Sequence, residues 1–287
     1  MSDTAVYHYK LAYPGEYNDA DTQFSLKWND PRIGIDWPRR NPLMYVSYKV
    51  MKHSQLFELF DMNVHAFVEF VSKIESLYEN NPFHNNVHAA QVVLNVDHLI
   101  NINKGLNLKP LEKLALYIAS IVHDAAHPGV SNKYIYDAYD AKTIIYNDEQ
   151  PSENHHIALC FRILRSPKFN FVKELSYDEF EKFRQYVIML VSATNLKNHF
   201  EIVTKLETLA AVKAKPAKPV IMSALIKLAD LGYAAMEEDL HQKWATLLQE
   251  ELYIQGDYER EQSMEISMFC DRSINQFATH QRGLFDY

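Results

Sequence analysis

The sequence predicts an all-α domain that follows a short N-terminal segment of a different character. The chain of 287 residues has only 7 glycines and 11 prolines, whereas sheet-rich folds use glycine in many tight turns. From Leu43 onward apolar residues recur with the period of a helix, and hydrophobic residues make up 47% of the chain. We therefore expect a multi-helix domain over residues 43–287, with long helices joined by short connections.

Residues 1–42 differ because their pattern is that of strands. Phe24, Leu26 and Trp28 alternate with polar neighbours, as does the run from Ile33 to Trp37, and alternation is the period of a β-strand. The segment ends in WPRRNP, and proline interrupts helices. We interpret residues 1–42 as a β-like or irregular extension, and a fused segment is one explanation of it.

Apolar periodicity and helix-start signals place the expected helices. Pro110 suits the first turn of a helix, and Ser152 is a candidate N-cap. Ser176 with Glu179 has the pattern of a capping box. The expected helical segments are one ending at Leu56–Phe60, Val64–Ile74, a start at His84–His88, Pro110–Val122, a helix with His155, Leu159 and Phe161, one from Ser176 towards Leu190, one with Leu225 and Leu228 after an exposed loop at Lys213–Pro219, and Glu237–Tyr253.

Charge and cysteine content exclude several classes of protein. A formal charge of −8 and a pI of about 5.9 argue against binding to duplex DNA or an anionic membrane, which needs a basic surface. Two cysteines exclude a disulfide scaffold and a Cys-rich zinc ribbon. The start of the chain is not a secretory signal, and no run of about 18 apolar residues is present. We expect a cytoplasmic protein without a nucleic acid polymer or a membrane as partner.

Histidines and aspartates gather where helices are expected to start or end. His84 and His88 are four residues apart at a helix start, a spacing that puts two imidazoles on one face. His123 and Asp124 follow an apolar helix, and Asp230 in IKLADLG ends another. Because a buried carboxylate without a partner is costly, both aspartates are expected to have one.

A metal ion is the partner that these side chains favour. His nitrogen with carboxylate oxygen is a ligand set for zinc, manganese or iron, while magnesium takes oxygen-rich sites. Each piece alone has a simpler explanation, such as a surface histidine pair or an aspartate bound to a neighbouring turn. Their joint occurrence at the ends of apolar helices predicts a metal site. Its ligands would be His88, His123, Asp124 and Asp230.

The order His…His-Asp…Asp resembles that of the HD superfamily of metal-dependent phosphohydrolases. Residues 43–287 resemble more closely the catalytic domain of the class I 3′,5′-cyclic nucleotide phosphodiesterases. The matching strings are NPFHNNVHAAQVV, IVHDAAHPGVSN, ENHHIALCFRIL, LADL, EELYIQGDYERE, CDR and HQRGLFDY. The most specific is HDxxHxGxxN, from His123 to Asn132. The resemblance implies a compact all-α fold with two metal ions at the floor of a deep pocket.

The resemblance also implies a role for each matching residue. The four ligands would hold a tight ion, read as Zn²⁺, and Asp124 would bridge to a second, read as Mg²⁺ with Mn²⁺ as the alternative. The reaction implied is hydrolysis of cAMP, cGMP or both to the 5′-monophosphate by a hydroxide between the ions. His84 would be the general acid that protonates the departing O3′. His127 and Glu153 would orient metal-bound waters and ligands.

Five further positions match the part of the pocket that holds the purine. Gln281 matches the glutamine that hydrogen-bonds the base, Leu248 and Leu284 match the walls of the slot, and Phe269 matches another lining position. Leu284 stands where the family has a phenylalanine, so we expect weaker substrate binding, because aromatic stacking is lost. Tyr233 replaces a small polar residue, which puts purine selectivity in doubt.

The two ends of the chain depart from the family pattern. The family domain continues past the FDY block, so we expect this domain to be truncated at its C-terminus. The segment LKWNDPRIGIDWP resembles the C-terminal region of dTDP-4-dehydrorhamnose 3,5-epimerases, without their catalytic part, and no epimerase activity is expected. Two alternatives to a phosphodiesterase stay open: another HD-type nucleotide phosphohydrolase, or a catalytically silent, truncated or chimeric metal-binding module.

Overall fold

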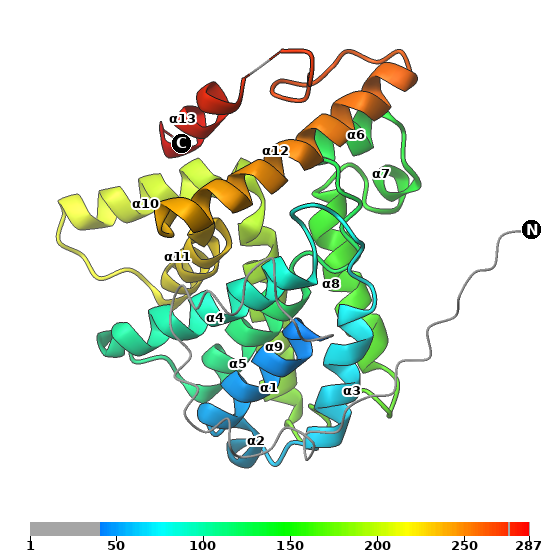
Figure 1. The fold of residues 1–287 in the computed structure, drawn as a ribbon. Helices are drawn as coiled ribbons and strands as arrows, with labels where there is room; N and C mark the ends of the chain where they lie inside the picture. Colours follow the sequence, from blue (N-terminus) through cyan, green and yellow to red (C-terminus); the bar gives the residue numbers. More distant parts are fainter. Residues whose placement is uncertain (1–40, 275, 287) are drawn as a thin grey trace, which may run out of the picture.

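A computed structural model describes residues 41–286 apart from Asn275, with side chains to Gly283. Every element within these residues is helical, which confirms the predicted all-α class (Figure 1). The strand-like segment expected before Pro42 lies outside the described residues. The helices are Pro42–His53 (α1), Leu56–Leu59 (α2), Val64–Glu75 (α3), Asn86–Ile102 (α4), Pro110–Val122 (α5), Asn132–Asp137 (α6), Ala141–Ile145 (α7), Pro151–Leu164 (α8), Tyr177–Thr194 (α9), His199–Ala211 (α10), Lys218–Asp230 (α11), Glu238–Glu261 (α12) and Phe277–Asp286 (α13), with 3-10 turns at Lys104–Leu106 (η3), Leu196–Asn198 (η4) and Leu231–Ala235 (η5).

Helix α5 is the centre of the main core. Its residues from Leu114 to Val122 are at most 2% exposed, because the helix is apolar on all sides and is surrounded by α1, α3, α4, α8, α9 and α11. Because α5 is enclosed up to its last residue, the residues that follow it are also placed in the interior of the protein. The residues that follow are His123 and Asp124, so the chain places a polar pair at the inner end of its most buried element.

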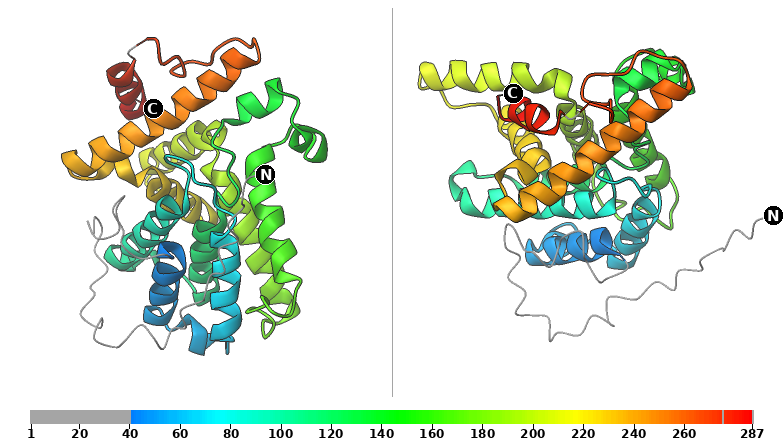
Figure 2. Two further views of the ribbon diagram at one scale, coloured as in Figure 1. Left: turned by 45° about the vertical axis from the view of Figure 1, so that its right-hand side comes forward. Right: turned by 45° about the horizontal axis from the view of Figure 1, so that its top comes forward.

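A smaller apolar cluster lies where α12 passes over the rest of the molecule. Figures 1 and 2 show α12 crossing the top of the helical body, with α13 beside it. The cluster joins α12 to η5 and to the loop before α4, and its buried members are Phe83, Tyr233, Met236, Trp244 and Ala245. This packing brings residues of α12 within reach of the starts and ends of α4, α5 and α11.

Several helix starts agree with the sequence signals. Pro110 opens α5, and the reciprocal capping box of Ser176 and Glu179 opens α9. Two details were wrong. The helix expected to run to Phe60 breaks at Gln55, whose φ of 55° is left-handed and cannot continue a helix. Ser152 is not the N-cap of α8, because Pro151 already occupies the first turn of this helix.

Glu75, the last residue of α3, holds the start of two other helices. Its carboxylate accepts hydrogen bonds from the backbone N–H groups of Leu43 and Met44 in the first turn of α1, and from Asn86 at the start of α4. Burial raises the pKa of Glu75 to about 7, although the three hydrogen bonds lower it. The carboxyl group therefore replaces a local N-cap for α1, because the side chain of Asn41 makes no capping bond.

Glu75 makes the stability of the fold depend on pH. Between the unfolded pKa of 4.5 and the folded pKa of about 7, the native state binds more protons than the unfolded state. The contribution of Glu75 to the free energy of unfolding is therefore full below the unfolded pKa and is lost as pH rises through about 7. The loss amounts to up to about 3 kcal/mol. Urea unfolding between pH 4.5 and 8 should show this slope in the wild type and not in Glu75→Gln, whereas exposed Glu79→Gln should keep it.

No single helix in the described part of the chain is long and apolar enough to cross a membrane. One pair of segments, Lys218–Ala235 and Glu238–Glu261, passes that test together on length and composition alone, with a bend of 107° between them.

Candidate metal centre and active-site pocket

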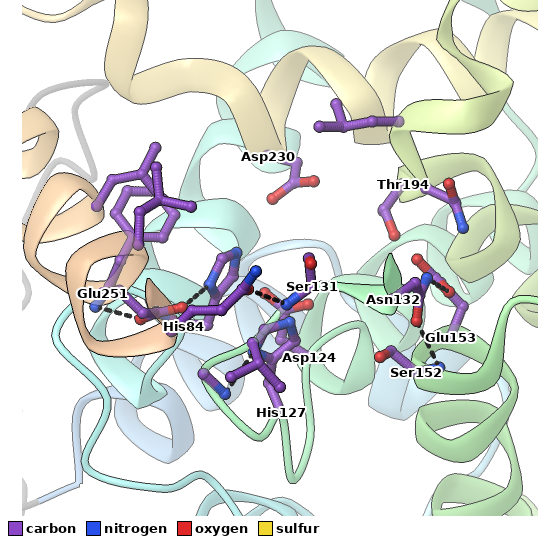
Figure 3. Close-up of a pocket in the computed structure, with 18 of the residues that line it drawn as sticks. His84, Asp124, His127, Ser131, Asn132, Ser152, Glu153, Thr194, Asp230 and Glu251 are labelled. Atoms are coloured by element: carbon purple, nitrogen blue, oxygen red, sulfur yellow. Dashed lines mark hydrogen bonds and ion pairs between the residues drawn. The ribbon is translucent and has the colours of Figure 1, made fainter. Parts of the chain in front are cut away.

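A pocket of about 430 Å³ opens where the ends of several helices meet. It is lined from the loop before α4, the loop between α5 and α6, the first turn of α8, the end of α9, the end of α11, and one face of α12. Figure 3 shows His84 and Glu251 on one side of it and Asn132 and Glu153 on the other, with Asp124 and Asp230 between them. Five of the polar residues expected to be functional thus line one cavity, namely His84, Asp124, His127, Glu153 and Asp230.

Four side chains from three helix ends converge beside this pocket, and two of them, Asp124 and Asp230, line it. Asp230 Oδ1 lies 3.1 Å from His88 Nε2 and 3.3 Å from His123 Nε2. Asp124 Oδ2 lies 3.1 Å from His123 Nε2 and 3.5 Å from His88 Nε2. The two imidazole nitrogens are 3.3 Å apart. The structure therefore brings together all four of the residues that the sequence predicted as metal ligands.

The geometry and the protonation of this cluster fit a divalent cation. A zinc ion about 2.1 Å from each ligand leaves neighbouring ligand atoms about 3.0–3.4 Å apart, close to the observed separations. His123 Nδ1 lies 2.9 Å from the carbonyl oxygen of Ser120, so a neutral ring that donates to this oxygen would turn its Nε2 lone pair towards the two carboxylates. Burial would lower the pKa of His123, but the charges of Asp124 and Asp230 outweigh it and raise this pKa well above its usual range. Asp124 Oδ2 is buried and has no hydrogen-bond partner among the described residues. A divalent cation bound here would replace the proton on His123 and offset the charge of the two carboxylates.

The imidazole of His84 and the carboxylate of Glu251 form a hydrogen-bonded pair beside the cluster. His84 lies just before α4, not on it, and its Nδ1 bonds to the carboxylate of Glu251 on α12. The other oxygen of Glu251 accepts the backbone N–H groups of Phe83 and His84, at 2.8 and 3.0 Å. Burial would lower the pKa of His84, but the adjacent carboxylate outweighs it and raises the pKa to about 9. His84 is therefore a cation at neutral pH, with its other ring nitrogen available.

His127 lies face to face with His84. The ring centroids are 4.1 Å apart, and His127 Nδ1 accepts a hydrogen bond from the backbone of Gly129. Burial and the charge of His84 together lower the pKa of His127 to about 3. In the stacked pair His84 is thus protonated and His127 is neutral, so His84 is the member of the pair that can donate a proton.

The opposite wall of the pocket is a set of linked amide and carboxyl groups. Asn132 Nδ2 donates to Glu153, and Asn132 Oδ1 accepts the backbone N–H of Ser152. Burial raises the pKa of Glu153. Lys227, almost fully buried on α11, donates to the carbonyls of residues 194 and 195 at the end of α9. These hydrogen bonds hold in place the wall that carries Glu153, on the side of the pocket opposite His84.

The residues predicted to hold a purine are spread over more of the structure. Leu248 and Tyr233 line the pocket, whereas Phe269 and Gln281 do not. The ring of Phe269 stacks on His280, and His280 lines the cavity instead. Gln281 is buried on α13, and neither atom of its amide has a partner in the described part of the chain. The side chain of Leu284 lies outside the described residues.

Glu251 is a site residue that the sequence reasoning missed. Trp244, Leu248, Glu251 and Gln255 follow one another at helical spacing along the buried face of α12. Trp244 and Leu248 made that stripe apolar, so a carboxylate that continues it had to be buried and to have a partner. That signal was present, but it did not say that the partner was His84.

The chain is similar to cyclic nucleotide phosphodiesterases in three comparisons. Residues 83–287 match the family model described as 3′5′-cyclic nucleotide phosphodiesterase. A probable 3′,5′-cyclic-AMP phosphodiesterase of Caenorhabditis elegans is 32% identical over 91% of this chain and 40% of its own length. A dual specificity calcium/calmodulin-dependent 3′,5′-cyclic nucleotide phosphodiesterase of Mus musculus is 32% identical over 85% of this chain and 35% of its own. The chain thus spans well under half the length of these relatives.

The fold has a close counterpart among solved structures. The phosphodiesterase domain of a RhoPDE fusion protein from the choanoflagellate Salpingoeca rosetta superposes with a TM-score of 0.86. The match covers 94% of this chain and 87% of that one, at 23% sequence identity. At this identity the likeness concerns the arrangement of the helices.

Proposed function

Because the chain belongs to the 3′,5′-cyclic nucleotide phosphodiesterase family, we propose that it hydrolyses cAMP, cGMP or both to the nucleoside 5′-monophosphate. One observation carries the proposal. A cluster of acceptor atoms that fits a divalent cation lies in the same pocket as a histidine whose pKa is raised to about 9. Hydrolysis of a cyclic nucleotide is accelerated by a Lewis acid at phosphorus and by a proton for the strongly basic leaving oxygen, and both can be supplied here.

The metal site would be formed by His88, His123, Asp124 and Asp230. A bound divalent cation supplies Lewis-acid activation of water and phosphate. The two nitrogen and two oxygen donors favour Zn²⁺ at this position, and Asp124 would also hold a second ion, for which Mg²⁺ or Mn²⁺ is proposed because both favour oxygen donors. Glu153 and His127 would hold the ligands and waters around the ions, as their positions in the pocket support.

His84 is proposed to give its proton to O3′ as the phosphorus–oxygen bond breaks. The alkoxide that would otherwise leave is strongly basic, so the proton is worth most at this step. Glu251 keeps the ring charged and in one orientation through Nδ1, which directs the Nε2 proton into the cavity. Water or product then restores the proton to the ring.

A purine would lie in the apolar part of the pocket. Leu248, Leu252 and Phe83 exclude water there. The Tyr233 hydroxyl, on a residue that lines the pocket, is a buried polar group without a partner among the described residues. Such a group is costly unless something binds it, which supports a base with hydrogen-bonding edges as its ligand. The cytoplasmic location predicted from the sequence stays a prediction.

The direct test is to incubate the purified chain and Mg²⁺ with cAMP and, separately, with cGMP, and to follow the 5′-monophosphate. Formation of AMP or GMP that stops on chelation and returns with added metal is the expected result. A folded, metal-loaded sample without turnover would contradict the proposal. It would favour a silent metal-binding module or a different phosphoester.

Replacing Glu251 by glutamine should move the alkaline limit of activity to lower pH. The protonated form of His84 is the acid, so wild-type kcat should fall as pH rises through about 9. Without the carboxylate, burial lowers the pKa of His84, and the fall should occur near or below its ordinary value of 6.5. Profiles of kcat from pH 6 to 10 measure this shift. Glu250→Gln, which changes the exposed neighbouring carboxylate, should leave the profile in place.

A further inference from the structure

Asn81 joins the two loops that carry His84 and His127, although it does not line the pocket. Its side-chain amide donates to the carbonyl of His84 at 3.0 Å and to the carbonyl of His127 at 2.8 Å. The two acceptors are the backbone carbonyls of the two histidines whose rings stack, and these residues are 43 positions apart in the sequence (127 − 84). One amide group thus bridges the loop before α4 and the loop after α5.

The loop that contains Asn81 is also fixed to the start of α4. The carbonyl of Asn81 accepts a hydrogen bond from the side chain of Asn85 at 3.0 Å. Asn85 is the N-cap of α4 and accepts the backbone N–H groups of Val87 and His88. His84 therefore sits in a turn that is held at one end by the cap of the helix that presents His88.

The contact between the two loops leaves no room for a side chain at Gly129 unless the Asn81 amide moves. Gly129 has a φ of +70°, and a Cβ atom added to it would lie 2.8 Å from Asn81 Oδ1. Real Cβ atoms do not approach so closely, so the glycine is needed both for its backbone conformation and for space. The side-chain amide of Asn81 is therefore held by its two hydrogen bonds and also by close packing against Gly129.

We propose that Asn81 is a positioning residue that sets the place of His84 over the reacting phosphodiester, an inference that rests on the proposed function. Glu251 charges His84 from α12, but it does not bond to the loop after α5. Asn81 makes that second connection, to the loop that begins at the ligands His123 and Asp124. Loss of the amide frees the acid relative to the metal centre, whereas the described hydrogen bonds of Asn81 include none to the four metal ligands.

The test compares two substrates that differ in their need for a proton. The O3′ alkoxide of a cyclic nucleotide is strongly basic and leaves with a proton, whereas bis(p-nitrophenyl) phosphate expels a weakly basic phenolate that needs little help. Asn81→Ala and Asn81→Asp each remove the two N–H donors, and the aspartate keeps the shape of the side chain. We expect kcat for the cyclic nucleotide to fall by about 10- to 100-fold, with a fall of less than about 3-fold for the activated ester and an unchanged metal content.

Three further variants make the result specific. His84→Ala shows how unequally kcat for the two substrates falls when the acid itself is lost. Gly129→Ala should cause a smaller fall of the same kind, because its methyl group displaces the Asn81 amide. Asn198→Asp is the matched control, because its amide donates to a single carbonyl, that of Ser192 near the end of α9, and neither residue lines the pocket. It should show no selectivity between the substrates.

The outcomes separate this inference from the proposed function. A wild-type protein that turns over neither substrate would contradict the proposed function. A wild-type protein active on both, with Asn81 variants that lose both equally or neither, would overturn the role of Asn81 alone. Loss of the fold or of bound metal in both Asn81 variants, measured by thermal unfolding and metal analysis, would show a purely structural residue and overturn it as well.

Discussion

Replacing Asp230 by alanine is expected to abolish hydrolysis of cyclic nucleotides and to release the tightly bound metal. Asp230 Oδ1 lies within 3.3 Å of both His88 Nε2 and His123 Nε2, so it is the carboxylate that closes the four-atom cluster. Its loss removes a ligand and leaves two imidazoles with a single carboxylate. The fall in kcat should exceed the roughly 10²–10³-fold that removal of one electrostatic donor costs, because the Lewis acid itself is lost.

Metal content and turnover should be measured on the same samples. Elemental analysis after gel filtration gives the bound metal, and excess Zn²⁺ should restore little activity to Asp230→Ala. Chelation of the wild type should reproduce the loss, and added metal should reverse it. Asp239→Ala removes an exposed carboxylate nine residues further along and should behave as the wild type. Full metal retention in Asp230→Ala would contradict the assignment of this residue as a ligand.

The sequence was most informative where chemistry and helix ends coincide. Asp124 and Asp230 could be identified because each follows or ends a run of apolar residues, where a carboxylate stands out against its surroundings. The helix starts at Pro110 and Ser176 could also be predicted, since proline and the capping box act on residues close to them in the sequence. Signals of this kind are local, and local signals can be recognised in a single sequence.

Features that depend on distant contacts could not be found in that way. In the sequence Asn81 cannot be distinguished from other polar loop residues, because its hydrogen bond to the loop after α5 forms only in the folded protein. The break at Gln55 rests on a left-handed residue in a stretch that otherwise has helical periodicity. The placement of Phe269 and Gln281 depends on how the segment after α12 packs against that helix, and the sequence of either segment alone does not determine this packing.

His84→Ala should lower kcat by about 10²–10⁴-fold and leave the bound metal in place. The ring of His84 is not one of the four converging ligands, so its removal takes away the proton donor without opening the metal cluster. Metal analysis beside kcat separates this variant from Asp230→Ala. Exposed His65→Ala is the matched control and should have wild-type turnover. Equal metal loss in His84→Ala and Asp230→Ala would contradict the division of roles between them.

The same variant should also show what the pair of His84 and Glu251 costs the fold. In the wild type, burial would raise the pKa of Glu251, but His84 outweighs it and lowers the pKa to about 2. Without the imidazole, the carboxylate of Glu251 stays buried, and the backbone N–H groups of residues 83 and 84 are the hydrogen-bond donors left to it among those described. His84→Ala should therefore lose about 1–3 kcal/mol of stability. Adding Glu251→Gln removes the stranded charge and should recover part of that loss in urea unfolding, yet it should restore no turnover. A double variant that regains activity would show that the buried carboxylate, not the missing acid, had limited the reaction.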